Sequence, residues 1–451
     1  MQEKLILKEC CRYAIGTWAD VIYRNALLLP EGEALIYGKE RITFAQFNSR
    51  VNRLIHGLHS MGLKMGDGIG IISWNCLEYC DVYGAAMKGG FIVSPLNPRL
   101  QADEMDYLIN YWEVGTLFVG RELVERVTPL RPRFAKVKNC ISLETSASGM
   151  ISHYDLLMAH SEEEPDVQVK EDDPLLIFYT SGTTGTPRGA LYTEGRNLEN
   201  ARIKSFELGV ERGDKHIMFL PFFHVAGFSH FWSFFYGGGC NVIMQQRSFD
   251  PAAVLQLIQE EKATDIHIVP TQLVNLLALP NIEKYDLSSL KRIWYGASSM
   301  PVELLKKGME RFGAIFMQGY GQSESGPEVT FLPKKSHHVL DKSLEEQKIL
   351  ASCGQPSLGV HVRVVDENDD DVTPYAIGEI ILKSNAMMVG YWHKPDETRD
   401  VLIDGWLHTG DLGYYDRQGY IYIVDRKKDM IISGGENVYP REIEEVLYQH
   451  P

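Results

Sequence analysis

The sequence predicts an α/β fold, and three observations support this. Helical and strand-like patterns alternate over the first third of the 451 residues, which is typical of a parallel sheet wrapped by helices. Short buried strands that end in small or polar residues continue through the middle third. The last third changes character, because its strands suit an antiparallel sheet and are followed by the opening of a helix.

Each expected element rests on its own residues. The first helix runs from Thr43 to about Met61, since its apolar residues step by three and four and Thr43 with Gln46 is placed as a capping box. A second helix is expected through Met87 and a third over 102–112. Strands are expected over 68–72, 91–96, 116–120, 175–179, 215–220, 265–269 and 292–295, and antiparallel strands over 377–384 and 420–425. A last helix opens at 440–450, and the acidic run 366–371 reads as a solvated turn.

Composition excludes several classes of protein. A hydrophobic content of 44% suits an ordinary globular protein, and a net charge of −15 argues against a nucleic-acid binder. No apolar run approaches the roughly 18 residues of a membrane span, and the start lacks a signal peptide, so a cytoplasmic protein is expected. Seven cysteines without a CxxC pair indicate reduced thiols, with Cys76 and Cys80 as buried apolar residues rather than metal ligands.

A loop rich in glycine and hydroxyl groups follows the strand at 175–179. Its glycines free backbone amides, its hydroxyls add donors, and Arg188 supplies a cation, which together make an anion nest. The loop is not a Walker A motif, because no Gly-Lys-Ser/Thr closes it. A flexible connector is the alternative, which the position directly after a buried strand disfavours. The loop residues that carry this interpretation are Thr180, Ser181, Gly182, Thr183, Thr184, Gly185, Thr186 and Gly189.

Three further segments fit the same ligand. The segment 220–227 places His224 among apolar residues. The segment 319–324 offers the ring of Tyr320 to a base and the carboxylate of Glu324 to Mg²⁺. The segment 406–413 presents Asp411 in a tight turn, where its oxygens could accept hydrogen bonds from a ribose diol. The alternatives are a structural histidine, a solvated surface charge and an Asx-turn.

With Gly296-Ala297-Ser298 and the segment 425–429, six motifs stand in the order found in adenylate-forming enzymes. The chain resembles this superfamily, which includes acyl-CoA synthetases, peptide-synthetase adenylation domains and firefly luciferase, over nearly its whole length. The resemblance implies two doubly wound α/β subdomains, a small β-barrel-like subdomain and the start of a small C-terminal α+β domain. It also implies domains at 1–427 and 428–451, with the hinge at Lys428.

The resemblance implies a role for each motif residue. The phosphates would lie on residues 180–185 and Arg188, and Mg²⁺ on Glu324. Catalytic roles fall to Thr180, Arg188, His224 and Glu324. The remaining nucleotide contacts fall to Gly296, Ala297, Ser298, Gly319, Tyr320, Gly321, Gln322, Ser323, Asp411 and Arg426, with Tyr320 at the adenine and Asp411 and Arg426 at the ribose. Gly434 and Gly435 would flank the arm of coenzyme A.

Two departures from the family pattern stand out. Arg188 stands where the family usually has Lys, and Gly195 stands where it commonly has His. The change to Arg188 keeps the positive charge but alters the geometry of the hydrogen-bond donors. Family members also continue beyond the hinge into a small domain whose lysine serves adenylation. Only the first segment of that domain is expected in 429–451, so no residue here takes the role of that lysine.

The expected activity is that of an ATP-dependent acyl-CoA synthetase, which converts a carboxylic acid through an acyl-adenylate to the CoA thioester. His224, Val225, Ala226, Gly296 and Gly321 would line the acid pocket. The absence of a side chain at Gly321 suits a medium or long-chain fatty acid or an aryl acid, unless that glycine only serves a backbone turn. The alternatives are an acyl-AMP ligase that loads a carrier protein and a non-catalytic nucleotide-binding homologue. The partners would be the acid, ATP and CoA, and the sequence allows a homodimer.

Overall fold

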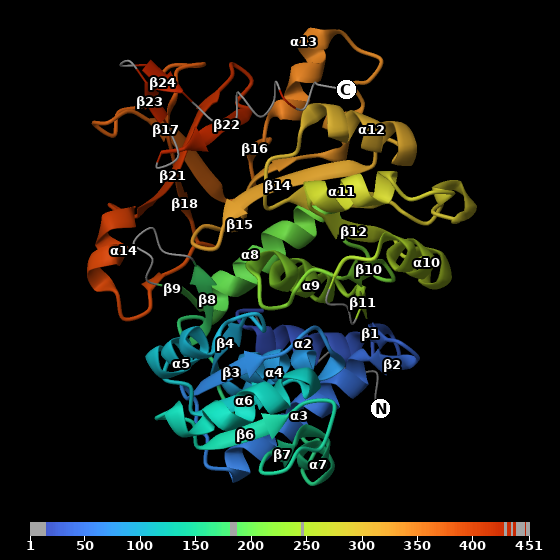
Figure 1. Ribbon diagram of the computed structural model, residues 1–451, viewed down its shortest axis with the longest axis vertical. Coiled ribbons are helices and arrows are strands. Elements are labelled where there is room, and N and C mark those ends of the chain that lie inside the picture. The colour runs from blue at the N-terminus through green and yellow to red at the C-terminus, as the bar shows by residue number, and fades with distance from the viewer. Residues whose placement is uncertain are drawn as a thin grey trace. The chain divides into compact units, whose positions relative to one another are not determined.

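The computed structural model describes residues 15–180, 187–244, 248–427, 431–433, 436–438 and 447. The chain divides into two compact units (Figure 1). Unit 1 comprises Met1–Ser205, Val210–Ser248 and Met388–Lys394, and unit 2 comprises Phe206–Gly209, Phe249–Met387 and Pro395–Pro451. In the described part of the chain, no helix combines the length and the apolar character that a membrane crossing needs.

Unit 1 alternates helices and strands along most of its length. Its helices are α2 (Trp18–Leu28), α3 (Phe44–Ser60), α4 (Leu77–Gly89), α5 (Ala102–Tyr111), η1 (Arg121–Leu123), α6 (Val124–Val127), η2 (Thr128–Arg133), α7 (His153–Met158), most of α8 (Glu194–Leu208) and α9 (Val225–Gly237). Its strands are β1 (Glu33–Tyr37), β2 (Glu40–Thr43), β3 (Gly68–Ile72), β4 (Ile92–Leu96), β5 (Thr116–Val119), β6 (Asn139–Ser142), β7 (Ile151–Ser152), β8 (Pro174–Thr180), β9 (Arg188–Thr193), β10 (Lys215–Met218), β11 (Cys240–Ile243) and β19 (Gly390–Tyr391).

The main sheet of unit 1 has the strand order β19-β9-β8-β4-β3-β5-β6-β7. The strands from β8 to β7 run parallel, whereas β9 and β19 add antiparallel pairs at one edge. A core under α5 joins Met105 and Ile109 to Ile72 and Leu117 of the sheet. The strands β10, β11, β1 and β2 form a second, mostly parallel group in the same unit. This is the helix-wrapped parallel arrangement that the alternating sequence pattern predicts.

Unit 2 begins in the same manner and ends in antiparallel strands. Its helices are α10 (Pro251–Glu261), α11 (Pro270–Leu277), η3 (Ile282–Lys284), α12 (Val302–Phe312), η4 (Lys334–His337), α13 (Leu344–Gln347), η5 (Lys348–Ala351) and α14 (Pro395–Val401). Its strands are β12 (Asp265–Ile268), β13 (Arg292–Gly296), β14 (Phe316–Gln322), β15 (Gly326–Leu332), β16 (Gln355–Pro356), β17 (Val360–Val365), β18 (Gly378–Ser384), β20 (Leu402–Ile403), β21 (Trp406–Tyr415), β22 (Ile421–Arg426), β23 (Ile431–Ser433) and β24 (Glu436–Val438).

Unit 2 carries two separate kinds of sheet. In the first, β12, β13 and β14 are parallel, and β15 and β16 continue antiparallel. The second is a small antiparallel sheet of order β17-β18-β21-β20, with β22 paired to β21. The strands β23 and β24 pair in antiparallel orientation. The sheets of the two units confirm the predicted fold class, which combines doubly wound α/β parts with a small antiparallel part.

Local predictions agree with the structure to within a few residues. The α3 helix begins after Thr43, whose hydroxyl accepts a hydrogen bond from the Gln46 amide, while the Gln46 side chain accepts one from the Thr43 amide. The five apolar residues of the predicted stripe, Phe44, Phe47, Val51, Leu54 and Leu58, are all buried. The turn at 366–371 is exposed, as expected. Cys76 and Cys80 are free and fully buried. Of the helix expected at 440–450, only residue 447 is described.

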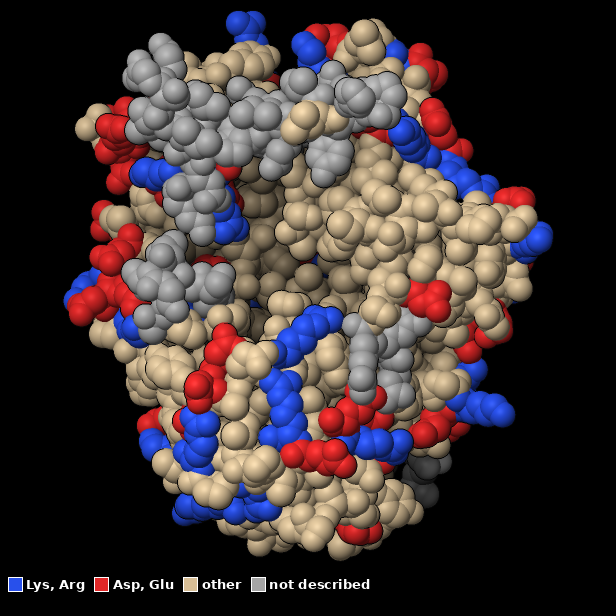
Figure 2. Space-filling model, in the orientation of Figure 1, with Lys and Arg blue, Asp and Glu red and all other residues tan. Residues whose placement is uncertain are grey.

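On the face drawn in Figure 2, Lys and Arg side chains are interspersed with Asp and Glu side chains. Exposed ion pairs occur in the structure, such as Lys262 with Asp286 and Lys348 with Glu345. Pairs of this kind contribute little to stability, because solvent screens them.

Candidate functional site

A cavity of about 270 Å³ lies within unit 2. Its wall is built from the ends of β13 and β14, the chain just before β16, and the paired strands β21 and β22. The carboxyl ends of parallel strands are where open α/β sheets bind ligands. The lining residues are Ala297, Ser298, Ser299, Gln318, Gly319, Tyr320, Gly321, Gln322, Ala351, Cys353, Asp411, Ile423, Asp425 and Arg426.

Two glycines allow the strands at this edge to pack closely. Gly296 and Gly319 are cross-strand partners in the β13–β14 pairing. A Cβ on Gly296 would lie 2.6 Å from the carbonyl oxygen of Gly319, and a Cβ on Gly319 would lie 2.1 Å from the ring of Trp294. Side chains other than hydrogen therefore do not fit here without movement of the strands. The chain then turns at Ala297, whose φ of 64° is unusual for a residue with a side chain.

Asp411 is the centre of the polar contacts around the cavity, and its side chain is almost fully buried. Its Oδ2 accepts hydrogen bonds from the Tyr320 hydroxyl at 2.7 Å and from Nε2 of Gln322 at 2.6 Å. Its Oδ1 lies 3.2 Å from Nε of Arg426, which pairs with Asp411 across β21 and β22. The structure thus brings together Tyr320, Gln322, Asp411 and Arg426, four residues that the sequence assigns to one ligand.

The contacts of Asp411 hold both the strand and the ring of Tyr320. Gln322 also donates from Nε2 to the carbonyl oxygen of Thr409 at 3.1 Å, so one amide group grips two residues of the same turn. Burial, together with the nearby Asp411 carboxylate, raises the pKa of Tyr320 well above its usual value. The phenol therefore stays protonated and continues to donate. The Asp411 carboxylate is bound by side chains from other strands, which is not the pattern of an Asx-turn.

Ser323 and Glu324 lie in the turn between β14 and β15, where both are half-buried. The turn is closed by Ser325, whose hydroxyl accepts a hydrogen bond from the Gln322 amide at 2.7 Å and donates to the carbonyl oxygen of Gly326 at 2.6 Å. Gly321, just before the turn, lies opposite residues 327–329, because the pairing of β14 with β15 shifts between Tyr320 and Gln322 and the extra residues are on β15. A Cβ on Gly321 would lie 2.3 Å from the carbonyl oxygen of Gly326, so this glycine is required by close approach of the two strands.

Unit 1 carries the residues of the predicted phosphate loop. Its two arms are the antiparallel strands β8 and β9, which pair Thr180 with Arg188. The guanidinium of Arg188 lies over the ring of Tyr391 at 5.2 Å from the ring centre. The loop residues 181–186 lie outside the described part of the chain, as do Lys428, Gly434 and Gly435.

His224 caps the start of α9 in unit 1, followed by the half-buried Val225 and Ala226. Its side chain is exposed, although its ring packs beside Phe223 at a centroid distance of 4.5 Å. Partial desolvation and the charge of Arg99 lower the pKa of His224, so the ring is neutral at pH 7. The segment before it is fixed by Asn75, whose side chain donates to the carbonyl oxygen of Leu220 at 2.8 Å and accepts from the Phe222 amide at 2.9 Å.

Sequence reasoning missed several residues of the cavity wall. Gln318 precedes the recognised motif by one position. Because side chains alternate between the two faces of a strand, Gln318 lies on the same face of β14 as Tyr320, and this spacing could have predicted its place at the cavity. Cys353 and Ile423 carry no such signal, because a buried cysteine and a strand isoleucine are ordinary core residues. Only the strand pairing places them at the cavity.

Comparison with known proteins gives three findings. A model of the AMP-binding enzyme family matches residues 22–392. A feruloyl-CoA synthase from an Amycolatopsis species is 34% identical, over 97% of this chain and 83% of its own length. The medium/long-chain-fatty-acid–CoA ligase FadD8 of Mycobacterium tuberculosis is 34% identical, over 92% of this chain and 72% of its own length.

A solved structure shares the fold. The anthranilate CoA ligase AuaEII in complex with anthranoyl-AMP superimposes with a TM-score of 0.90. The alignment covers 98% of this chain and 84% of that protein, at 24% sequence identity.

Proposed function

This chain belongs to the AMP-binding enzyme family, and we propose that the cavity in unit 2 holds the adenosine part of its nucleotide. The protein is an ATP-dependent acid–thiol ligase, which converts a fatty or aryl carboxylic acid through an acyl-adenylate to the CoA thioester. One observation carries the assignment of the cavity. It is the buried Asp411 carboxylate, held by Tyr320, Gln322 and Arg426 at the cavity wall.

The ribose would bind to Asp411. Ribose hydroxyls are hydrogen-bond donors, and a carboxylate at a dinucleotide site accepts from them. Oδ2 of Asp411 already accepts two hydrogen bonds, whereas Oδ1 faces only Arg426 among the contacts described above. The Arg426 side chain is 54% exposed, so it can move aside or share the carboxylate when the ribose arrives. Tyr320, Ala297 and Gly296 would then border the adenine.

The phosphates and the metal would be held by groups of matching charge. Thr180, the loop at 181–185 and Arg188 are proposed for the phosphates, and Glu324 for Mg²⁺. A half-buried carboxylate fits this ion, because Mg²⁺ prefers hard oxygen ligands. When bound, the ion would offset negative charge on the phosphate oxygens.

The chemistry needs positioning more than proton transfer. A carboxylic acid titrates near pH 4, so it is ionised at pH 7 and attacks the α-phosphorus without a general base. The P–O bond to pyrophosphate breaks as the acyl–phosphate bond forms. In the second step the thiol of CoA displaces AMP from the acyl carbon. The neutral ring of His224 adds no charge beside an apolar acyl group, which suits its proposed place at the acid.

The finer assignments stay proposals. Val225, Ala226 and Gly321 are proposed to border the acid, and Gly434 and Gly435 to flank the arm of CoA. A cytoplasmic location fits an enzyme that consumes ATP and CoA, and a homodimer is proposed as its assembly.

The test is an assay of both half-reactions. The protein is mixed with ATP, Mg²⁺ and one of acetate, octanoate, palmitate or ferulate, with CoA or with an acyl carrier protein as acceptor. We expect pyrophosphate release with the larger acids and thioester only with CoA. Thioester on the carrier protein alone would support the acyl-AMP ligase instead, and nucleotide binding without pyrophosphate would support a non-catalytic homologue.

A variant links this activity to the cavity. Asp411→Asn should raise the KM for ATP by about tenfold or more, since a neutral amide accepts weaker hydrogen bonds than a carboxylate. Asp371→Asn, an exposed residue of the small antiparallel part, is the control and should leave the KM unchanged. An unchanged KM for ATP in the Asp411 variant would show that the nucleotide does not bind in this cavity.

A further inference from the structure

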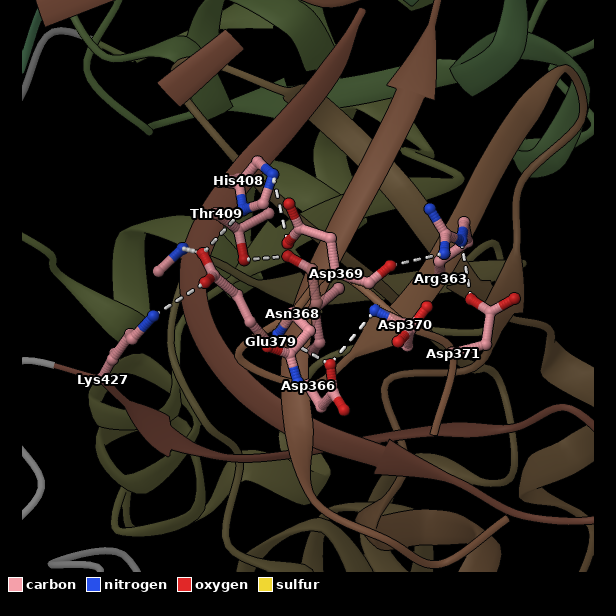
Figure 3. A network of polar contacts seen from close by, with 12 residues as sticks. Arg363, Asp366, Asn368, Asp369, Asp370, Asp371, Glu379, His408, Thr409 and Lys427 are labelled. Atoms are coloured by element: carbon pink, nitrogen blue, oxygen red, sulfur yellow. Dashed lines mark hydrogen bonds and ion pairs between the residues drawn. The ribbon is translucent and has the colours of Figure 1, made fainter. Parts of the chain in front are cut away.

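Glu379, near the start of β18, is a largely buried carboxylate that no motif of the sequence singles out. Its side chain is 13% exposed, and its two oxygens have different partners (Figure 3). Oε1 accepts a hydrogen bond from the Gly410 amide at 3.0 Å and lies 3.7 Å from Nδ1 of His408. Oε2 lies 3.2 Å from Nζ of Lys427.

The amide of Gly410 needs this partner because the strand is irregular there. In the pairing of β18 with β21, Ile381 faces His408 and Glu379 faces Leu412. Residues 409–411 therefore lie opposite the single residue Ile380, and they bulge out of the ladder. A bulge leaves backbone groups without their ladder partners. The Glu379 carboxylate accepts from one of them, and charge-assisted hydrogen bonds of this kind are stronger than neutral ones.

The rest of the bulge is held in a consistent way. The Thr409 hydroxyl donates to the carbonyl oxygen of Ile380 at 2.6 Å and accepts from the Asp411 amide at 3.0 Å. The Lys427 amide donates to the carbonyl oxygen of Gly410 at 2.8 Å. Both backbone polar groups of Gly410, which has a φ of 71°, are thus hydrogen-bonded, the amide to Glu379 and the carbonyl to Lys427. The side chains of these two partners also form an ion pair with each other.

The bulge matters because Asp411 is its last residue. Gln322 grips Asp411 and Thr409 from the side of β14, and Glu379 grips Gly410 from the side of β18. The carboxylate of Asp411 is therefore aimed by contacts on two sides of one turn. The ion pair with Lys427 is the weaker part of this arrangement, since the lysine side chain is 60% exposed.

We propose that Glu379 is a positioning residue for the ribose: by holding the Gly410 amide it fixes the bulge that presents the Asp411 carboxylate to the sugar diol. This inference rests on the proposed place of the nucleotide at Asp411. Glu379 does not touch the nucleotide itself, so its loss should reduce recognition of the diol more than affinity for the rest of the nucleotide.

Calorimetric titration of the full chain with AMP and with 2′,3′-dideoxy-AMP separates these effects. We expect the wild type to bind AMP at least about tenfold more tightly than the dideoxy compound, as two hydrogen bonds to a carboxylate should give. In Glu379→Ala that preference should fall to about twofold, with the affinity for the dideoxy compound unchanged. Glu379→Gln keeps an oxygen that can accept from Gly410 and should restore most of the preference.

Two further variants identify the contact that matters. Lys427→Met removes only the ion pair and should keep the preference for AMP. Asp371→Ala removes an exposed carboxylate that pairs with Arg363 in the same sheet, and it is the matched control. If Glu379→Ala does not fold, Glu379→Asp, which is too short to reach Gly410, carries the test and should show the same loss.

The outcomes are distinct. An unchanged AMP preference in folded Glu379→Ala or Glu379→Asp would overturn the positioning role while leaving the proposed function intact. An equal loss of affinity for both compounds would also overturn it, as would loss of the preference in Lys427→Met. If the wild type bound both compounds equally, the ribose diol would not be recognised by Asp411, and the inference would be overturned as well. A wild type that binds neither would count against the proposed function as well.

Discussion

The Asp411 carboxylate shows how much a single residue depends on its neighbours. Its oxygens are engaged by side chains from β14 and β22, and its turn is held from β18. The sequence predicted Tyr320, Gln322, Asp411 and Arg426 as parts of one site, because each belongs to a motif. It could not predict Glu379, because an acidic residue at the start of a strand looks like any solvated charge until the register of β18 and β21 is known.

The metal ligand can be tested at the same scale. Glu324→Gln keeps the size of the side chain but removes the charge that would bind Mg²⁺. We expect acyl-adenylate formation, measured by pyrophosphate exchange, to fall by about a hundredfold or more, because charge stabilisation at the phosphates is lost. The melting temperature should barely change, since Glu324 is half-buried in a turn.

Glu345→Gln is a suitable control, because Glu345 is a 78% exposed residue of the same unit that pairs with a lysine. It should keep full activity. Full activity in the Glu324 variant would show that Glu324 is not a ligand of Mg²⁺.

Among the elements, β14 packs closely against both neighbouring strands. Its residues 318–322 carry the motif, its glycines allow contact with β13 and β15, and Gly321 lies opposite the extra residues of β15 just before the turn. The sequence predicted nine of the described strands within a few residues, because buried strands have clear apolar patterns. The bulges of β15 and β21 were not predictable, since a bulge depends on the partner strand rather than on local sequence.

The irregular pairing of β14 with β15 changes the interpretation of Gly321. The sequence left two explanations for this glycine, an open channel for the acid or a requirement of the backbone. A Cβ at this position would lie 2.3 Å from the carbonyl oxygen of Gly326, which favours the requirement of the backbone. We expect Gly321→Ala to lower the free energy of unfolding by about 1 to 3 kcal/mol, as overpacking does. A chemical denaturation curve measures this change.

Gly115→Ala is the matched control, because its added methyl group would meet only the carbonyl oxygen of Gly68, at 3.7 Å. It should be nearly neutral. If Gly321→Ala is equally neutral, and Gly321→Trp shifts the acid preference toward acetate, the channel role is correct and the backbone argument is wrong.

At the scale of the whole molecule, acidic groups outnumber basic ones by fifteen. Glu78, in α4 of unit 1, is a half-buried carboxylate. Burial, together with the nearby Asp81 and Glu144 carboxylates, raises the pKa of Glu78 to about 7, although a hydrogen bond from its own backbone amide and the charge of Arg50 act in the opposite direction. The fold class was predictable from alternation alone, whereas this charge environment was not, because it depends on which helices pack together.

The raised pKa makes stability depend on pH. In the folded state Glu78 holds its proton up to about pH 7, whereas in the unfolded chain it loses it near pH 4.5. The contribution to stability is therefore fully present below pH 4.5 and is lost as pH rises toward 7. Glu78→Gln has no proton to lose. Its free energy of unfolding relative to the wild type should therefore increase by about 2 kcal/mol from pH 5 to pH 8.

Urea unfolding of both proteins at the two pH values measures this gain. Glu125→Gln, an exposed residue of the same unit, should show the same difference from wild type at pH 5 and pH 8. A Glu78 variant whose difference does not change with pH would show that this carboxyl titrates normally.

Five cysteines in the described part of the chain are free thiols, and all five are buried. A thiol reagent can modify such a residue only when the fold opens around it, so the rate of alkylation at each position reports local opening. Four of these cysteines lie in unit 1, whereas Cys353 lies at the wall of the cavity in unit 2. The chain therefore carries its own set of reporters, from which peptide mass spectrometry can obtain separate opening rates for the two units without any engineered label.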